Sequence, residues 1–276
     1  MGKITSEAFF QLMQTADVCA DLADYSIGFA KPVERENELD LVLAGSGTLI
    51  TAAGRRGILT ADHVIRALPD TGPIGLIMLS RFGPQNHQTI IEMEVVEKVT
   101  VGKASGEHGP DLALLLLPYA EAERIAAKKT FYNLDKRRAR ALEDGATVGG
   151  GWVLCGLLDV WTDRSKAGPQ SGSTYAFRGI CAPVHSPTPR SDEDFDYFVV
   201  PVDASRDIKE FGGCSGGGLW NVALVENAGT IEVQELMLAG VAYYQSGEAN
   251  GHRVIHCHGP KSIYSNTVDL LHSGAK

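Results

Sequence analysis

Cysteine is scarce in this sequence, and its thiols show no sign of pairing. The 276 residues include five cysteines, an odd number, and no two of them stand at close, regular spacing. A small scaffold held by disulfides is therefore excluded, and reduced thiols in a cytoplasmic protein are the expected state.

Basic charge and long apolar runs are also lacking. Lys and Arg total 25 against 34 Asp and Glu, which gives a formal net charge of -9. Because a general nucleic-acid binder usually carries a basic excess, no nucleic-acid partner is expected. Glu7, Asp17, Asp21 and Asp24 interrupt the N-terminal stretch. Neither a secretion signal nor a membrane association is expected there.

Glycine and short apolar segments are abundant. The chain has 31 glycines, and 44% of its residues are hydrophobic. Six β-like runs lie between residues 39 and 117, and six more between 147 and 258. Turn residues separate most of them. Because closing a sheet on itself removes exposed edges, we expect an all-β fold of two six-stranded antiparallel β-barrels.

Helical patterns flank and join these two groups. An amphipathic helix is indicated by the spacing of Phe9, Phe10, Met13 and Val18, and residues 261–272 resemble a closing helix. The resulting division is a helical extension over 1–32, a first barrel over 33–119, a charged linker over 120–146, and a second barrel with its C-terminal helix over 147–276.

The most informative segment is FGGCSGGGLW, residues 211–220, in which glycines flank Ser215 on both sides. A serine hydroxyl is a poor nucleophile unless a base removes its proton. Glycines allow a substrate carbonyl to approach the backbone closely. The N–H groups of Gly213 and Ser215 can then stabilise charge on the carbonyl oxygen.

Two further segments supply a base and its partner. In GILTADHVI, residues 57–65, an apolar strand delivers His63 at its end. In GPDLALLLL, residues 109–117, Asp111 stands at the start of a strand that is apolar on both faces. A half-buried carboxylate at that place can accept a hydrogen bond from an imidazole and fix its tautomer.

Together these segments resemble the trypsin-like serine peptidase family, and an intracellular, bacterial-type member of it. The resemblance rests on TADH, DLAL and GCSGG, supported by GSGTLI (45–50), GGGWVLCG (149–156) and LAGVAYYQ (238–245). Asp111 follows His63 by 48 residues and precedes Ser215 by 104, in the family's order. The resemblance implies a serine endopeptidase with His63, Asp111 and Ser215 as its triad, and an oxyanion hole formed by Gly213 and Ser215.

The sequence departs from the secreted members of that family at two places. Cys214 stands where they carry an aspartate that pairs with a new N-terminal amine, so activation by N-terminal cleavage is not expected. Lys209 occupies the position that, in trypsin relatives, helps to form the base of the primary substrate pocket. If Lys209 faces the pocket, with His256 or His258 assisting, an acidic substrate residue is favoured. The alternative is that Lys209 points to solvent.

The remaining expectations concern ligands and competing functions. Tyr243 and Tyr244 are expected to form an apolar wall along the substrate, or else to be core residues. No metal or cofactor is expected. The partners expected are a protein or peptide substrate and a regulatory protein. The alternatives to a peptidase are a catalytically weak trypsin-fold binding or scaffold module, or an esterase-type acyl hydrolase.

Overall fold

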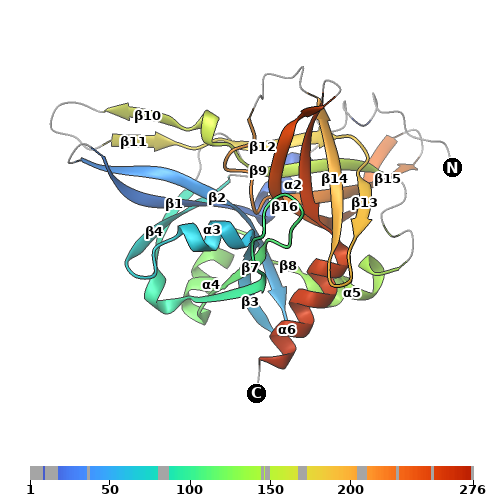
Figure 1. Cartoon of the computed structure of the whole chain (residues 1–276), viewed down its shortest axis with the longest axis horizontal. Coiled ribbons are helices and arrows are strands. Elements are labelled where there is room, and N and C mark those ends of the chain that lie inside the picture. Colours follow the sequence, from blue (N-terminus) through green and yellow to red (C-terminus); the bar gives the residue numbers. More distant parts are fainter. Residues whose placement is uncertain are drawn as a thin grey trace.

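The structure, a computed structural model, describes residues 9, 18–35, 38–79, 87–143, 146, 150–166, 173–203, 210–227, 230–249 and 252–274. Two β-sheets lie side by side, and the C-terminal helix runs beneath them (Figure 1). The helices are α2 (Val18–Tyr25), α3 (Asp62–Ala67), η1 (Met93–Val95), α4 (Tyr119–Ala126), α5 (Leu134–Ala141), η2 (Asp159–Trp161), η3 (Lys261–Thr267) and α6 (Val268–Ser273).

The first sheet has the order β5-β4-β1-β2-β3-β7-β6, with the short β8 added in parallel to β2. All its other pairings are antiparallel. Its strands are β1 (Ser26–Arg35), β2 (Glu38–Ala52), β3 (Arg55–Thr60), β4 (Pro73–Met78), β5 (His87–Glu92), β6 (Glu97–Gly102), β7 (Leu112–Leu116) and β8 (Tyr132–Asn133).

The second sheet has the antiparallel order β12-β9-β15-β16-β17-β14-β13. A separate hairpin of β10 (Asp163–Lys166) and β11 (Ser173–Ala176) projects from the body at the upper left of Figure 1. The strands of the sheet are β9 (Gly151–Leu157), β12 (Gly179–Val184), β13 (Thr188–Ser191), β14 (Asp196–Asp203), β15 (Gly218–Asn227), β16 (Thr230–Ala249) and β17 (His252–His258).

The mostly-β prediction with two antiparallel sheets and a C-terminal helix is confirmed, but the strand numbers differ. Along the described residues the sheets hold eight and seven strands rather than six each. In the first sheet the outermost strands are β5 and β6, and in the second they are β12 and β13. Pairing between the outermost strands would close each sheet into a barrel, and that closure stays a prediction.

The first sheet also begins earlier than the division at residue 33. Strand β1 starts at Ser26 and passes through Pro32. The residues of β1 that pair with β4 are Ile27 to Ala30, whereas the pairing with β2 runs along the whole strand. At Pro32 the strand therefore has one neighbour, and the missing N–H of proline breaks no second ladder.

Strand β7 shows how composition determines position. All five residues of LALLL are buried, and the strand lies between β3 and β6 in the first sheet. Leu112, Leu114 and Leu116 belong to one hydrophobic core, whereas Ala113 and Leu115 belong to another, so the two faces pack against different layers. Burial on both faces holds this strand, and the residue just before it, in a fixed place.

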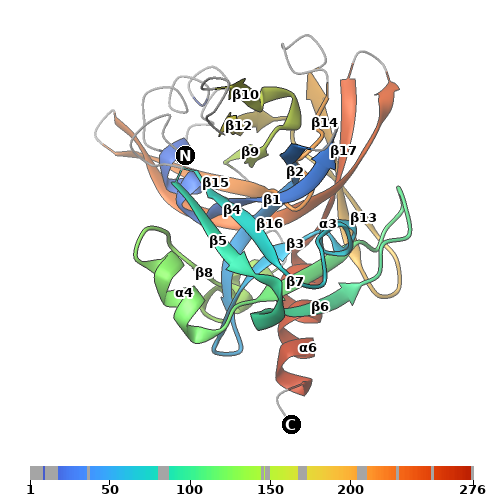
Figure 2. The same cartoon turned by 90° about the vertical axis from the view of Figure 1, so that its left-hand side faces the viewer.

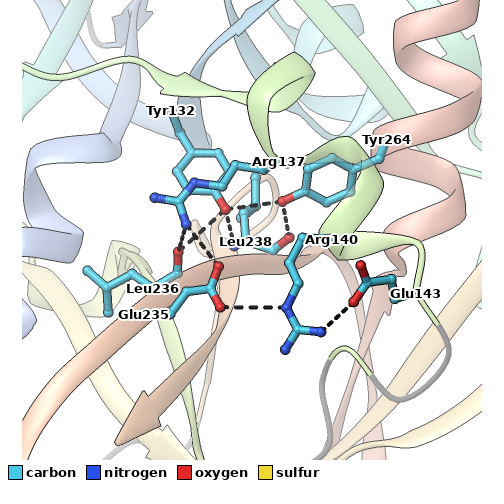
Figure 3. Close-up of polar contacts among 8 residues, drawn as sticks. All are labelled: Tyr132, Arg137, Arg140, Glu143, Glu235, Leu236, Leu238 and Tyr264. Carbon is cyan, nitrogen blue, oxygen red and sulfur yellow. Dashed lines mark hydrogen bonds and ion pairs between the residues drawn. The ribbon is translucent and has the colours of Figure 1, made fainter.

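The connector between the sheets is attached through α5. In Figure 3 the guanidinium of Arg137 approaches Glu235 on β16 at 3.1 Å, and Arg140 approaches the same carboxylate at 3.8 Å. Tyr264 on η3 donates to the carbonyl of Leu238 at 2.9 Å. The C-terminal helical segment and the connector thus both contact β16 (Figure 3). In Figure 2 helix α6 lies below the two sheets, next to the C-terminus. No described helix is long and apolar enough to cross a membrane.

Candidate active site

Helix α3 directly follows β3 and carries His63 in its first turn. Its position depends on Asp62, whose side chain is buried. The Asp62 carboxylate accepts hydrogen bonds from the Thr100 hydroxyl and the Ala104 N–H, each at 2.9 Å, and lies 2.9 Å from Arg66 Nε. A buried carboxylate that meets several donors anchors the helix to the loop after β6.

His63 and Asp111 form a close pair in the first sheet, where β3 ends and β7 begins. Nδ1 of His63 lies 2.6 Å from Oδ2 of Asp111, and the backbone N–H of His63 donates to Oδ1 at 2.9 Å. The Asp111 side chain is 6% exposed and that of His63 is 41% exposed. Because an ionised carboxylate only accepts, the ring proton sits on Nδ1, which leaves Nε2 of His63 as a base directed away from Asp111.

A second histidine, His258, stands behind this pair. The backbone N–H of Asp111 donates to Nε2 of His258 at 2.9 Å. An imidazole nitrogen that accepts a hydrogen bond carries no proton, so the ring of His258 is neutral with its proton on Nδ1. That Nδ1 has no hydrogen-bond partner among the described residues. Burial lowers the pKa of His258 to about 4.

Aromatic rings enclose His258. The ring of Tyr243 lies 4.9 Å from it and that of Tyr197 lies 5.2 Å away, measured between centroids. Tyr243 is 1% exposed, and its hydroxyl donates to the carbonyl of Glu107 at 3.0 Å. Of the two alternatives expected for Tyr243, its burial fits the core residue rather than the wall along the substrate, because this side chain packs behind the His63–Asp111 pair.

The loop that carries Ser215 lies between the two sheets and is held by Ser46 of β2. The N–H of Ser46 donates to the carbonyl of Ser215 at 2.7 Å. The hydroxyl of Ser46 donates to the carbonyl of Gly213 at 2.7 Å and accepts from the N–H of Leu157 at 2.8 Å. One residue of the first sheet therefore binds the loop at Gly213 and at Ser215, and also binds strand β9.

Glycine is required in this loop for lack of space. Gly216 has φ of +88°, and a Cβ there would lie 1.9 Å from the carbonyl oxygen of Ser46. Gly213 has φ of +87°. Among the described residues the N–H groups of Gly212, Gly213 and Ser215 have no acceptor, whereas those of Cys214, Gly216 and Gly217 donate to carbonyls. Gly213 and Ser215 therefore have N–H groups available for an oxyanion, and their role as an oxyanion hole stays a prediction.

Gly45 of β2 brings the histidine and serine segments together. A Cβ at Gly45 would lie 2.5 Å from the side chain of Val64 and 3.1 Å from the carbonyl oxygen of Ser215. Val64 follows His63 directly, so both segments border the same small residue. The structure has no hydrogen bond between Ser215 Oγ and His63, and such bonds are often long before substrate binds.

The residues expected on the substrate side are only partly placed. Lys209 lies outside the described residues. Tyr244 is 40% exposed on β16, as a substrate-facing residue requires. His256 is buried beside Tyr244, with Nε2 lying 3.3 Å from the Ser246 hydroxyl and 3.5 Å from Glu107. His258 is buried behind Asp111, so it cannot assist a substrate pocket.

Across the described ranges, no three His, Cys, Asp or Glu side chains converge as a metal site.

Comparison with known proteins gives the fold. No protein-family model and no curated protein matches the chain. A solved structure, the Drosophila Grass clip serine protease of the Toll pathway, matches with a TM-score of 0.51 at 14% identity, over 92% of this chain and 71% of that chain. It is one of 197 chains of solved structures that match.

The chain has the trypsin-like serine protease fold. At this identity the comparison gives the fold and no activity. Within the trypsin-like fold, sequence patterns indicated His63, Asp111 and Ser215, but not what surrounds them. The sequence by itself does not show that His258 contacts Asp111 or that Ser46, part of GSGTLI, holds the Ser215 loop. Their roles depend on contacts between strands far apart in sequence, and no local signal encodes those contacts.

Proposed function

We propose that this protein is a serine endopeptidase that uses His63, Asp111 and Ser215 as its triad. The observation that carries the proposal is the pairing of His63 with Asp111. Both carboxylate oxygens of a buried aspartate are directed at one histidine, at 2.6 Å to the ring and 2.9 Å to the backbone. That arrangement fixes the tautomer a general base needs.

The mechanism is acyl transfer. Nε2 of His63 takes the proton of Ser215 Oγ as the oxygen attacks a peptide carbonyl, and the N–H groups of Gly213 and Ser215 hold the developing oxyanion. His63 then protonates the leaving amine. A water molecule, deprotonated by His63, releases the acyl group from Ser215. Asp111 stays ionised and orients His63 throughout.

Activation does not use a new N-terminus in this proposal. Cys214 is 2% exposed, and burial raises the pKa of its thiol to about 12. A buried neutral thiol offers no charge to an N-terminal ammonium group. The described Ser215 loop is held instead by Ser46, Ala242 and its own backbone.

We further propose that the protein belongs to the intracellular, bacterial-type members of the family and acts in the cytoplasm on a protein or peptide. All five cysteines are free thiols, which supports a reducing compartment. A protease in that compartment needs restraint, so a regulatory protein partner is part of the proposal. Preference for an acidic substrate residue depends on Lys209 and stays a prediction.

Covalent labelling by a fluorophosphonate tests the triad. The wild-type chain should be labelled at Ser215, and Ser215→Ala and His63→Ala should lose labelling. Ser273→Ala, at the end of α6, is the matched control and should label like the wild type. Labelling that persists in Ser215→Ala, or none in the folded wild type, contradicts the proposal and supports a binding or scaffold module.

Substrate class is tested separately. A peptide library and a set of short acyl esters are offered to the wild type, with Ser215→Ala as the blank. Peptide cleavage that depends on Ser215 supports an endopeptidase. Turnover confined to esters indicates an esterase-type acyl hydrolase and contradicts the peptidase proposal.

A further inference from the structure

Three of the five cysteines meet on one face of the second sheet. Cys155 on β9 and Cys181 on β12 are directly opposite each other in an antiparallel pair, so their side chains share a face. Helix α2 contacts β9 and β12 and carries Cys19, whose thiol donates to the carbonyl of Cys181 at 3.6 Å. Residues far apart in sequence thus form a thiol cluster of Cys19, Cys155 and Cys181.

The three thiols differ in acidity. Hydrogen bonding to Cys181 lowers the pKa of Cys19 and of Cys155, and hydrogen bonds to the same two neighbours raise the pKa of Cys181 well above its usual value. Ser26 Oγ, 3.2 Å from Cys155 Sγ, and the Lys129 ammonium also lower the pKa of Cys155. The pKa values of Cys19 and Cys155 therefore lie below the usual value of a thiol, whereas that of Cys181 lies above it.

Exposure distinguishes Cys19 from Cys155. Cys155 is 1% exposed, whereas Cys19 and Cys181 are only partly buried. A small oxidant from solvent reaches Cys19 first. The other two cysteines, Cys214 and Cys257, are buried, and burial raises the pKa of each thiol. They lack both the access and the acidity that oxidation needs.

Backbone geometry selects the partner of Cys19. Cβ atoms of directly opposed residues in an antiparallel pair stand about 4.5–5.5 Å apart, whereas a disulfide needs about 3.5–4.5 Å. Cys155 and Cys181 are held at the ladder spacing by the pairing of β9 with β12. Cys19 belongs to a helix packed on the sheet, so no strand ladder fixes the spacing of its Cβ from that of Cys181. Its thiol already lies 3.6 Å from the carbonyl of Cys181, which makes Cys181 the partner within reach.

We infer that Cys19 and Cys181 form a site of reversible oxidation that takes a hydroperoxide as its oxidant. The Cys19 thiol attacks the peroxide, which is reduced to an alcohol or water as Cys19 becomes a sulfenic acid. The Cys181 thiol then displaces the hydroxyl, which leaves as water, and a disulfide remains. The bond ties α2 to β12 across 162 residues of chain. This inference is independent of any hydrolase activity.

The test is peptide mapping of the wild-type protein. The folded chain is treated with hydrogen peroxide, the remaining thiols are alkylated in denaturant, and the non-reduced digest is analysed by mass spectrometry. A linked pair of peptides containing Cys19 and Cys181, released by dithiothreitol, is expected, with Cys214 and Cys257 alkylated. Five alkylated thiols, a Cys155–Cys181 link, or Cys19 oxidised beyond sulfenic acid without a disulfide would overturn the inference.

Matched variants confirm the order of events. Cys155→Ser should still form the Cys19–Cys181 disulfide, because the buried thiol takes no part in the reaction. Cys181→Ser should leave Cys19 as a sulfenic acid that a dimedone probe traps. Loss of the disulfide in Cys155→Ser, with the far-ultraviolet circular dichroism unchanged, would contradict the inference. If either variant fails to fold, the wild-type map alone decides.

Discussion

Lowering the pH should destabilise this protein through one buried side chain, His258. The pKa of this residue is about 4 in the folded chain, against 6.5 for an ordinary histidine. Between those values the unfolded state binds one more proton than the folded state, so the free energy of unfolding falls as the pH falls. The loss begins as the pH drops through 6.5 and is complete below about 4.

The size of the effect follows from the same two values. With a tenfold change in equilibrium constant worth about 1.4 kcal/mol, His258 costs about 2 kcal/mol between pH 7.5 and pH 5. For a urea slope near 3 kcal/mol per molar, the midpoint of unfolding falls by about 0.7 M. The groups around the ring are Asp111, Tyr197 and Tyr243, with Asp192 acting at longer range.

Urea unfolding of the wild type and of His258→Gln at both pH values isolates this contribution. Glutamine can still accept the Asp111 N–H but does not titrate. We expect the variant to lose about 2 kcal/mol less than the wild type between the two pH values. His272→Gln, at an exposed position of α6, should behave like the wild type. Equal pH dependence in His258→Gln and the wild type would refute the buried neutral ring. If the variant does not fold, NMR titration of wild-type His258 is decisive, because a ring pKa near 6.5 contradicts the reasoning.

Further predictions concern the serine loop and the acids. Gly216→Ala should lower the free energy of unfolding by about 3–5 kcal/mol, because its Cβ meets a carbonyl oxygen, whereas Gly54→Ala, also at positive φ but in open space, should cost about 1 kcal/mol in urea unfolding. Asp111→Asn should slow fluorophosphonate labelling about 10³–10⁴-fold with the fold intact, and unchanged labelling would rule out its role. Asp62→Ala should lower thermal stability by about 3 kcal/mol, because a hydroxyl, an amide and a guanidinium lose their acceptor, and a loss below about 1 kcal/mol would contradict that anchor.

The sequence was most informative where chemistry depends on short segments. Glycine follows Ser215 because a side chain at position 216 would clash with the carbonyl of Ser46. A short glycine-rich segment of the sequence is enough to show that requirement. His63 and Asp111 each border a strand whose apolar residues are easily recognised. These positions could be predicted because the cause and the residue lie together in the chain.

Pairing between distant strands could not be predicted in the same way. The register of β16 against β17 shifts between Ala242 and Tyr244, so Tyr243 lies at an irregularity that turns it into the core. Simple alternation cannot show which tyrosine faces outward. The partner of His258 is likewise set by where β17 meets the segment before β7, a contact across 147 residues.

Ser46 gives the nucleophile loop a dependence on the whole molecule. It belongs to the first sheet, yet its hydrogen bonds hold Gly213, Ser215 and Leu157, which lie in the second half of the chain. Neither half alone contains the atoms that shape the loop. Two fragments divided within the connector should therefore be inert when separate and regain labelling only on reassembly. Labelling of Ser215 would then measure how far the two halves have associated, as the signal of a split reporter protein does.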